Sequence, residues 1–225
     1  NRKTFSDLPS GLRIKSSLQI NPQLSPDGCE ACSTADYKPI AKDGIVFNIK
    51  THFFSMPDFT SGYFEIQDEG SQLLADLMDP KPGNWALDYC AGSGGKTLAF
   101  APKMGGKGQI FLHDDRKTVL VQAKKRLKRA GIQNAQFHPL FSEALVKIKG
   151  KVDWVLVDAP CSGTGTLRRN PDMKWKFDQQ KLQSVVTEQQ QIFAQALDFV
   201  KPGGHIVYAT CSLLTDENEA QVSHF

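Results

Sequence analysis

Short apolar runs alternate with amphipathic segments from about residue 64 to the end of the chain. The runs predict strands over 85–89, 109–113, 135–138, 152–158 and 205–209. Apolar residues at helical spacing predict helices over 64–78, from the turn after residue 89 to about 104, and over 116–130 and 179–200. We expect Leu73, Leu74, Leu77 and Met78 on one face of the first helix, and Pro102 should end or kink the second. Strands that alternate with helices indicate an α/β fold with a doubly wound, mostly parallel sheet.

The first 58 residues lack this regularity. Five prolines interrupt them, and the one clear strand candidate spans 44–50. We therefore predict a small accessory region over 1–58 and a main domain over 59–225. A KPGG turn is expected at 201–204, directly before the last strand.

The composition excludes several classes of protein. Of 225 residues, 40% are hydrophobic and 23% are charged, which is typical of a soluble globular protein. The sequence has no apolar run near the ~20 residues of a membrane helix, and its first residues lack a signal-peptide core. We therefore expect a cytoplasmic protein without a membrane partner. Five cysteines do not suggest a disulfide framework, and the one CxxC pair, Cys29 and Cys32, lacks the second pair of a structural zinc site, so no metal is predicted.

Positive charge is concentrated in two places, although the net charge is only +3. The run KKRLKR at 124–129 alternates with apolar residues at helical spacing, which favours a solvated helix face. The second cluster consists of Arg168, Arg169, Lys174 and Lys176, with Trp175 between the lysines. Cations that hold phosphates beside a ring that stacks on a base are what a single-stranded RNA site requires. We predict RNA binding by Arg168, Arg169, Lys174 and Trp175; a packing role for Trp175 is the alternative.

Two predicted strands run directly into a cysteine. The segment VDWVLVDAPCSGTG (152–165) contains Cys161, and HIVYATCS (205–212) contains Cys211. Because parallel strands end at the same edge of a sheet, both thiols and Asp158 are expected in one crevice. Two thiols in one crevice suggest covalent chemistry, and inert buried thiols are the alternative interpretation.

The loop after the first main strand reads DYCAGSGGKT, from Asp88 to Thr97. A phosphate-binding loop requires glycine where Cys90 stands, and a dinucleotide fingerprint requires glycine where Thr97 stands. An acidic residue followed by small residues fits instead the pattern of S-adenosylmethionine-dependent enzymes, whose cofactor has no phosphate and needs close approach of bare backbone. Asp114 ends the next strand, where a carboxylate binds ribose hydroxyls; Asp115 is the alternative, and a helix cap is the alternative role. The predicted cofactor-binding residues are Asp88, Cys90, Ala91, Gly92, Ser93, Gly94, Gly95, Lys96, Asp114 and Asp158.

Together these motifs resemble the RsmB/NOL1/NSUN family of RNA (cytosine-5)-methyltransferases. The matching segments cover roughly residues 60 to 225: FEIQDEGSQL (64–73), LDYCAGSGGKT (87–97), DAPCSGTG (158–165), RRNPDMKW (168–175) and YATCS (208–212). The resemblance implies a Rossmann-like class I methyltransferase fold, S-adenosylmethionine as methyl donor and a cytosine in RNA as acceptor, with ribosomal RNA preferred over transfer RNA. It also implies that residues 1–58 are part of an RNA-binding domain. We further expect a monomer.

The resemblance also implies roles for the site residues. Carbon 5 of cytosine is a poor nucleophile, and a thiolate that adds to carbon 6 activates it. The family's pattern gives this attack to Cys211 and the later elimination to Cys161; the DNA cytosine methyltransferases would instead make Cys161 the nucleophile. Asp158 should stabilise the adduct near N3, and Lys96 should touch the cofactor or the catalytic centre. The alternative functions are transfer RNA methylation and a catalytically weak RNA-binding or ribosome-assembly factor on the same fold.

The chain departs from the family's pattern in three places. The acidic residue usual after the third strand is missing from FHPLFSEA (137–144), so either cofactor binding is weaker or Ser142 or Glu143 compensates. Gly92 and Ser93 replace the more usual Ala-Pro of the glycine loop. The sheet is expected to be truncated after its fifth strand, because a complete class I sheet has two more strands, which would leave an open edge.

Overall fold

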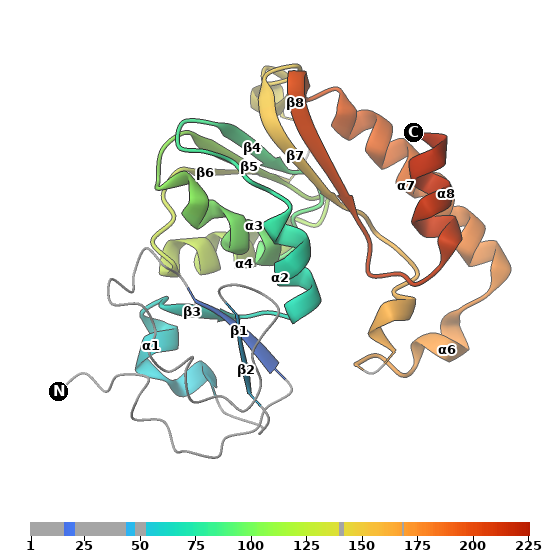
Figure 1. Cartoon of the computed structure of the whole chain (residues 1–225), viewed down its shortest axis with the longest axis horizontal. Coiled ribbons are helices and arrows are strands. Elements are labelled where there is room, and N and C mark those ends of the chain that lie inside the picture. Colours follow the sequence, from blue (N-terminus) through green and yellow to red (C-terminus); the bar gives the residue numbers. More distant parts are fainter. Residues whose placement is uncertain (1–15, 21–43, 48–52, 140–141, 168) are drawn as a thin grey trace.

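A parallel sheet of five strands forms the centre of the molecule (Figure 1). The computed structural model describes residues 16–20, 44–47, 53–139, 142–167 and 169–225. The strands are β4 (Trp85–Asp88), β5 (Gln109–His113), β6 (Ala135–His138), β7 (Val152–Asp158) and β8 (Val200–Ala209), in the order β6-β5-β4-β7-β8. The strand order reverses between β4 and β7, and doubly wound sheets bind their ligands at that point. The predicted α/β fold is therefore confirmed.

Apolar residues on both faces of the sheet explain why its strands are nearly continuous hydrophobic runs. In β5, Ile110 and Leu112 point to one face and join a core cluster with residues of α3 (Gly95–Phe100) and α4 (Lys117–Arg129). Phe111 points to the other face, where the cluster includes Leu145 of α5 (Glu143–Val146) and Phe199. This alternation follows from the two-residue period of a strand and divides the core into two layers.

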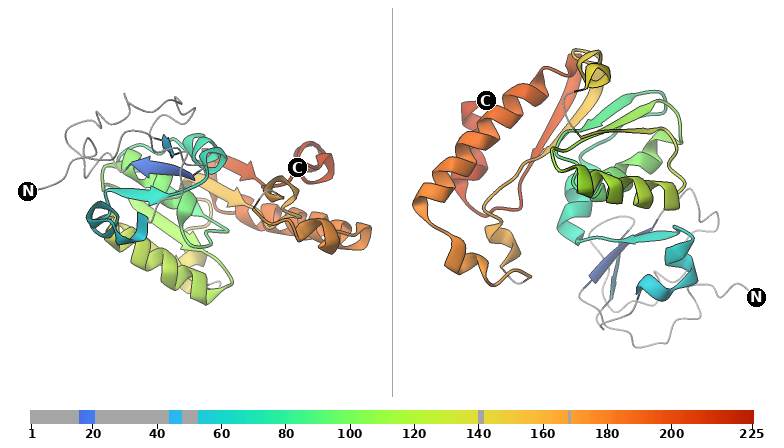
Figure 2. Two further views of the ribbon diagram at one scale, coloured as in Figure 1. Left: turned by 90° about the horizontal axis from the view of Figure 1, so that it is seen from below. Right: turned by 180° about the vertical axis from the view of Figure 1, so that it is seen from behind.

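Helix α7 (Gln179–Leu197) packs along β7 and β8, and the short α8 (Glu219–His224) lies against α7 (Figure 1). The predicted effect of Pro102 is confirmed, because α3 ends at Phe100 and the chain continues as a 3-10 helix over Ala101–Met104. The short helix α6 (Met173–Lys176) lies in the segment that connects β7 to α7. The ends of β7 and β8 thus approach a region bounded by α7 and this connection (Figure 2).

A second, antiparallel sheet lies beside the first (Figure 2). It contains β2 (Gly44–Phe47), β1 (Ser16–Ile20) and β3 (Phe64–Ile66), with the short helices Phe53–Ser55 and α1 (Pro57–Thr60) next to it. This small sheet takes strands from both sides of residue 58. The accessory region and the main domain are therefore joined by backbone pairing between β1 and β3.

The predicted helix over 64–78 is wrong in its first turn. Residues 64–66 form β3, and α2 begins at Glu69 and ends at Asp76. The Asp68 side chain accepts a hydrogen bond from the Gly70 backbone amide at 3.1 Å and caps the helix, which fixes its start. The predicted apolar face is also wrong, because Leu77 is 60% exposed while Met78 is fully buried.

The predicted KPGG turn is wrong as well. Residues 201–204 belong to β8, which begins at Val200. A register irregularity lies between the pairs Val152–Val200 and Trp154–His205, so that β8 carries extra residues opposite β7. The positive φ of Gly203, 75°, belongs to this bulge and not to a turn.

Candidate active site

Asp88 is the buried acceptor at the end of β4. The Thr97 hydroxyl donates to its Oδ2 atom at 2.6 Å, while Oδ1 is buried and has no hydrogen-bond partner among the described residues. Burial raises the pKa of Asp88 to about 7, and the Thr97 hydrogen bond only partly opposes this shift. The unpaired oxygen is an acceptor that a ligand's cationic amino group can satisfy.

Asp114 holds the backbone of the glycine loop. Its Oδ2 atom accepts from the Gly92 amide at 2.8 Å, and both carboxylate oxygens accept from the Arg116 guanidinium at 2.9 Å. Burial opposes the charge of Asp114, but the bonds from Arg116 and Gly92 outweigh it and lower the pKa of this carboxyl. Asp114 is nearly fully buried, whereas the neighbouring Asp115 side chain is 86% exposed. Both residues line the cavity. Asp114, the predicted ribose-binding residue with Asp115 as its alternative, is the one that binds the glycine loop.

Ser93 and Gly94 connect the glycine loop to α4. Gly94 has φ 77° at the start of α3, a conformation that favours glycine, and a Cβ atom there would be crowded, at 2.9 Å from the Leu127 side chain and 3.2 Å from that of Ala123. The Arg126 guanidinium donates to the Ser93 carbonyl at 2.9 Å and to its hydroxyl at 2.8 Å. Arg126 also pairs with Glu65 of β3 at 3.1 Å. Arg126 and Arg129, which both pair with Glu65, are half-buried, so the predicted solvated face is wrong for these two side chains.

These groups line a cavity of about 720 Å³ at the carboxyl ends of β4 and β5. Nine of the ten predicted cofactor residues border it; the exception is Gly94, which packs against α4. The volume of the cavity and the buried Oδ1 atom of Asp88, unpaired within the described part of the chain, fit a nucleoside cofactor with an amino group. Three further groups of lining residues had no role predicted from the sequence. The β3–α2 segment contributes Ile66, Gln67, Asp68 and Ser71, and α7 contributes Glu188, Ile192 and Gln195. The third group consists of Arg116 and Arg126.

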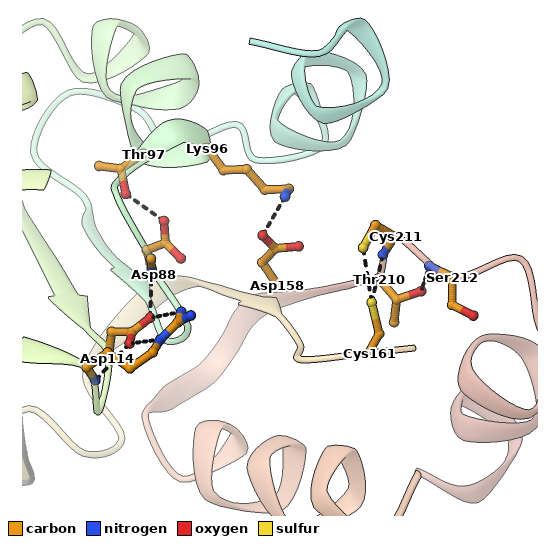
Figure 3. A network of polar contacts seen from close by, with 11 residues as sticks. Asp88, Lys96, Thr97, Asp114, Asp158, Cys161, Thr210, Cys211 and Ser212 are labelled. Atoms are coloured by element: carbon orange, nitrogen blue, oxygen red, sulfur yellow. Dashed lines mark hydrogen bonds and ion pairs between the residues drawn. The ribbon is translucent and has the colours of Figure 1, made fainter. Parts of the chain in front are cut away.

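Lys96 links the cavity to the ends of β7 and β8. Its ammonium lies 2.5 Å from a carboxylate oxygen of Asp158, across the space between α3 and β7 (Figure 3). The Lys96 side chain is 12% exposed and that of Asp158 is 34% exposed, so the pair is shielded but open on the Asp158 side. The pair joins one end of the site to the other.

The two predicted thiols do meet. The Sγ atoms of Cys161 and Cys211 are 3.1 Å apart, and the Cys211 amide donates to the Cys161 sulfur at 3.4 Å (Figure 3). The hydrogen bond from the Cys161 thiol lowers the pKa of Cys211 to about 7, with burial and Asp158 acting against it and Lys96 supporting it. The same contact and burial raise the pKa of Cys161. Cys211 is therefore the more readily ionised of the two thiols.

The predicted RNA-binding residues are spread along the connection to α7. Trp175 is 80% exposed, and the Lys174 ammonium lies 4.8 Å from its ring centre. Arg169 pairs with Asp68 at 3.0 Å and borders the cavity. Arg168 lies outside the described residues.

Neither residue expected to replace the missing acid reaches the cavity in the described part of the chain. Ser142 caps α5 and contacts a ring nitrogen of His138 at 2.8 Å. Glu143 is exposed in the first turn of the same helix. Glu188 and Gln195 of α7 border the cavity and supply polar groups there.

Sequence reasoning missed Glu217. This residue follows the second cysteine segment, is completely buried, and accepts hydrogen bonds from Ser162 and Ser212. The dipeptide Cys-Ser occurs in both cysteine segments and could have singled out Ser162 and Ser212, but it carries no signal for Glu217 itself.

The doubly wound sheet, the glycine loop and the two carboxylates at the ends of β4 and β5 define a Rossmann-like methyltransferase domain. Residues 75–225 match the family model described as 16S rRNA methyltransferase RsmB/F, and the chain belongs to this family. Within the described residues, no helix is long and apolar enough to cross a membrane, and no group of three or more His, Cys, Asp or Glu side chains could hold a metal ion.

Two curated relatives are similar over most of the chain. The probable ribosomal RNA small subunit methyltransferase B of Synechocystis sp. is 35% identical over 76% of this chain and 39% of its own length. The 26S rRNA (cytosine-C(5))-methyltransferase nsun-1 of Caenorhabditis elegans is 35% identical over 80% of this chain and 28% of its own length. The chain therefore spans less than half the length of these relatives.

Two solved structures from Pyrococcus horikoshii share the fold. A methyltransferase homologue has a TM-score of 0.78 and 28% identity, over 93% of this chain and 68% of its own. The structure of NSun6 with SFG has a TM-score of 0.70 and 27% identity, over 85% of this chain and 51% of its own.

Proposed function

We propose that this chain transfers a methyl group from S-adenosylmethionine to carbon 5 of a cytosine in ribosomal RNA. The family and the names of the relatives, which specify rRNA and cytosine C5, support this reaction. The observation that carries the proposal is the pair of thiols, Cys161 and Cys211, 3.1 Å apart, next to Asp158 and the cavity. A methyltransferase that acts on oxygen or nitrogen has no need of two thiols.

The cavity residues are suited to the cofactor. The free oxygen of Asp88 would accept from its amino group, Asp114 would bind its ribose hydroxyls, and the backbone from Ala91 to Ser93 would lie along it. When bound, the cofactor supplies a methyl group activated by a positively charged sulfur. Lys96 borders this cavity and pairs with Asp158 at the end of β7.

The thiol pair divides the chemistry at the base. The Cys211 thiolate forms a carbon–sulfur bond at carbon 6 of cytosine, and the displaced electron pair makes carbon 5 nucleophilic. The Asp158–Lys96 pair can supply a proton to N3 of the ring, which neutralises the negative charge that the thiolate adds. After carbon 5 takes the methyl group, a base removes its hydrogen as a proton, and the electron pair of that bond re-forms the ring double bond. The carbon–sulfur bond breaks at the same time and Cys211 leaves as a thiolate, with Cys161 assisting this elimination. The lowered pKa of Cys211 supports its role as the attacking thiolate, and the raised pKa of Cys161 supports a thiol that stays protonated during the attack.

The connection from β7 to α7 is the proposed RNA surface. Trp175 is exposed for stacking, and Lys174 and Arg169 place positive charge near it. The target base must leave its stack, which costs roughly a few kcal/mol and favours an unpaired cytosine. Because the reaction needs both cysteines as free thiols, we also propose that the protein acts in the reducing cytoplasm.

Trapping of the covalent adduct tests this function. The wild-type chain should transfer labelled methyl groups from S-adenosylmethionine to unmodified small-subunit ribosomal RNA, and less to transfer RNA. With the cofactor present, Cys161→Ala should accumulate a protein–RNA adduct on a denaturing gel, whereas Cys211→Ala should form none. The reverse pattern would exchange the two roles, and no transfer to any cytosine by the wild type would overturn the function.

A further inference from the structure

Glu217 forms a bridge between the two cysteine segments. It ends the 3-10 helix Thr215–Glu217 and is completely buried. Its carboxylate accepts from the Ser162 amide at 2.7 Å and from the Ser162 hydroxyl. The same carboxylate oxygen that binds this hydroxyl also accepts from the Ser212 hydroxyl. Because Ser162 follows Cys161 and Ser212 follows Cys211, one carboxylate fixes the residues adjacent to both thiols (Figure 3 labels Ser212 beside Cys211).

Helix α7 anchors this bridge from a third side. The Gln189 side-chain amide donates to Glu217 at 2.9 Å and to the Pro160 carbonyl at 3.0 Å. Gln189 in turn accepts from Gln221 of α8 at 2.9 Å. Glu217 is therefore held against two helices, and the loop that precedes Cys161 is tied to the same point.

The carboxylate is ionised and has its acceptor sites filled. Burial alone would raise the pKa of Glu217, but the hydrogen bonds from Ser162, Ser212 and Gln189 outweigh it and hold the pKa below its usual value. An ionised carboxylate offers about four lone-pair sites. Four donors occupy them here: the Ser162 amide, the two serine hydroxyls and the Gln189 amide.

The two loops also touch directly. The Gly165 amide donates to the Cys211 carbonyl at 2.9 Å, and a Cβ atom on Gly165 would lie 2.7 Å from that oxygen. Thr164 contacts the Ser212 hydroxyl at 3.1 Å and accepts from the Leu213 amide at 2.9 Å. The separation of the thiols thus depends on how closely these loops are drawn together.

We propose that Glu217 is a positioning residue that clamps the two cysteine segments together and so sets the distance between the attacking and the eliminating thiol. The inference rests on the proposed function for its catalytic consequence, although the clamp itself can be measured without RNA. Glu217 does not touch the base; it acts through Ser162 and Ser212.

Glu217→Ala and Glu217→Gln separate positioning from charge. Glu217→Ala should lower kcat for RNA methylation by about 10²-fold, because a displacement near 1 Å has effects of that size, while KM for cofactor and RNA stays within about threefold. Glu217→Gln should restore most of the rate, since its amide oxygen can accept from the Ser162 amide and Gln189 and its NH₂ group can donate to the serine hydroxyls. Glu219→Ala, an exposed glutamate two residues on, is the matched control and should match the wild type.

The pH profile of Cys211 alkylation by iodoacetamide gives a readout independent of methyl transfer. The groups that interact with Cys211 are Cys161, Asp158 and Lys96. The midpoint should lie near pH 7 in the wild type and rise by about one unit or more in Glu217→Ala, because the hydrogen bond from Cys161 is weakened when the loops separate. It should stay near 7 in Glu217→Gln and Glu219→Ala. Ser162→Ala, which retains the carboxylate and the backbone bond, should give a smaller rise in the same direction and serves if Glu217→Ala does not fold.

The outcomes distinguish the two proposals. A wild type that alkylates with a midpoint near 7 but methylates no RNA contradicts the function and leaves the clamp testable by alkylation alone. A wild type that methylates RNA, with unchanged kcat and unchanged midpoint in folded Glu217→Ala, overturns the clamp. If neither Glu217→Ala nor Ser162→Ala moves the midpoint while thermal unfolding shifts, Glu217 serves stability only and the clamp is equally overturned.

Discussion

The site has two ends that are built in different ways. At the cofactor end, the carboxylates of Asp88 and Asp114 lie at strand ends. Asp114 binds the loop backbone, while one oxygen of Asp88 has no partner among the residues that the structure describes. At the thiol end, the carboxylate of Glu217 has all its acceptor sites filled by groups of the protein, and the reactive atoms are those of its neighbours. An unpaired buried oxygen is suited to binding, and a saturated one is suited to positioning.

Lys96 and Asp158 join the two ends, so replacing Asp158 should have the largest effect. Asp158→Asn cannot pass a proton to N3 of the base and leaves the Lys96 ammonium, 2.5 Å from Asp158 in the wild type, without its partner. We expect kcat to fall on the order of 10²–10⁴-fold, with a change in cofactor Kd of less than about tenfold. Single-turnover methylation and calorimetry measure the two quantities. Asp198→Asn, at an exposed pair with Lys149, is the control; a loss that appears only in Kd would place Asp158 at the cofactor end instead.

Asp88→Asn should weaken cofactor binding and leave kcat nearly unchanged. An amide cannot neutralise the cofactor's amino group, and hydrogen bonds to charged groups contribute about 1.5–3 kcal/mol, so Kd should rise about 10- to 100-fold. At saturating cofactor, kcat should change by less than about threefold. Asp115→Asn, at the exposed carboxylate that also borders the cavity, should leave Kd within about twofold. Equal effects of the two substitutions would argue against Asp88 as the acceptor.

The raised pKa of Asp88, about 7, predicts opposite pH trends for stability and binding. The folded, ligand-free protein keeps a proton on Asp88 up to about pH 7, whereas the unfolded chain loses it near pH 4, so unfolding free energy should fall between these values as pH rises. Cofactor binding needs the ionised form, so Kd should increase by up to about tenfold per pH unit below 7. Titration calorimetry at pH 5.5 to 8 checks this, and Asp88→Asn should abolish the slope.

The sequence predicted the strands of the sheet better than it predicted the side-chain contacts between distant segments. The bounds of β5, β6 and β7 were predicted correctly. For β5 and β7 the reason is that they are distinct apolar runs, whereas β6 (AQFH) alternates apolar and polar residues. The start of β8 was missed because two glycines indicate a turn, whereas the structure absorbs them in a bulge. Local patterns also predicted the meeting of Cys161 and Cys211, since both follow parallel strands.

Contacts between distant segments left no local signal. Glu217 binds Ser162 from 55 positions away, and nothing in its own segment distinguishes it from the exposed Glu219. Arg126 has its partner Glu65 at a separation of 61 residues, and the periodicity of α4 indicates only that the position lies near the edge of the apolar face. Such residues are found from structure because their role depends on what the fold brings next to them.

Arg126 offers the smallest and most specific test, because it connects the cofactor end to the small sheet. Its guanidinium holds both the carbonyl and the hydroxyl of Ser93 and pairs with Glu65 of β3. Arg126→Met retains the apolar stem and removes these bonds, so the glycine loop loses a support whose hydrogen bonds go to Ser93 and Glu65 rather than to the thiols. Cofactor Kd should rise about two- to tenfold with kcat unchanged, given about 0.5–1.5 kcal/mol per hydrogen bond.

Lys125→Met, at the exposed neighbouring position, separates this effect from the loss of a positive charge on α4. If Arg126→Met shifts only the unfolding temperature and leaves Kd at the wild-type value, the small sheet supports the fold without influencing the loop. If Kd rises as expected, the small sheet contributes to cofactor binding through Glu65 and Arg126, in addition to Ile66 of β3, which borders the cavity. The accessory sheet would then belong functionally to the cofactor end, whereas the thiol end is held by α7 and Glu217.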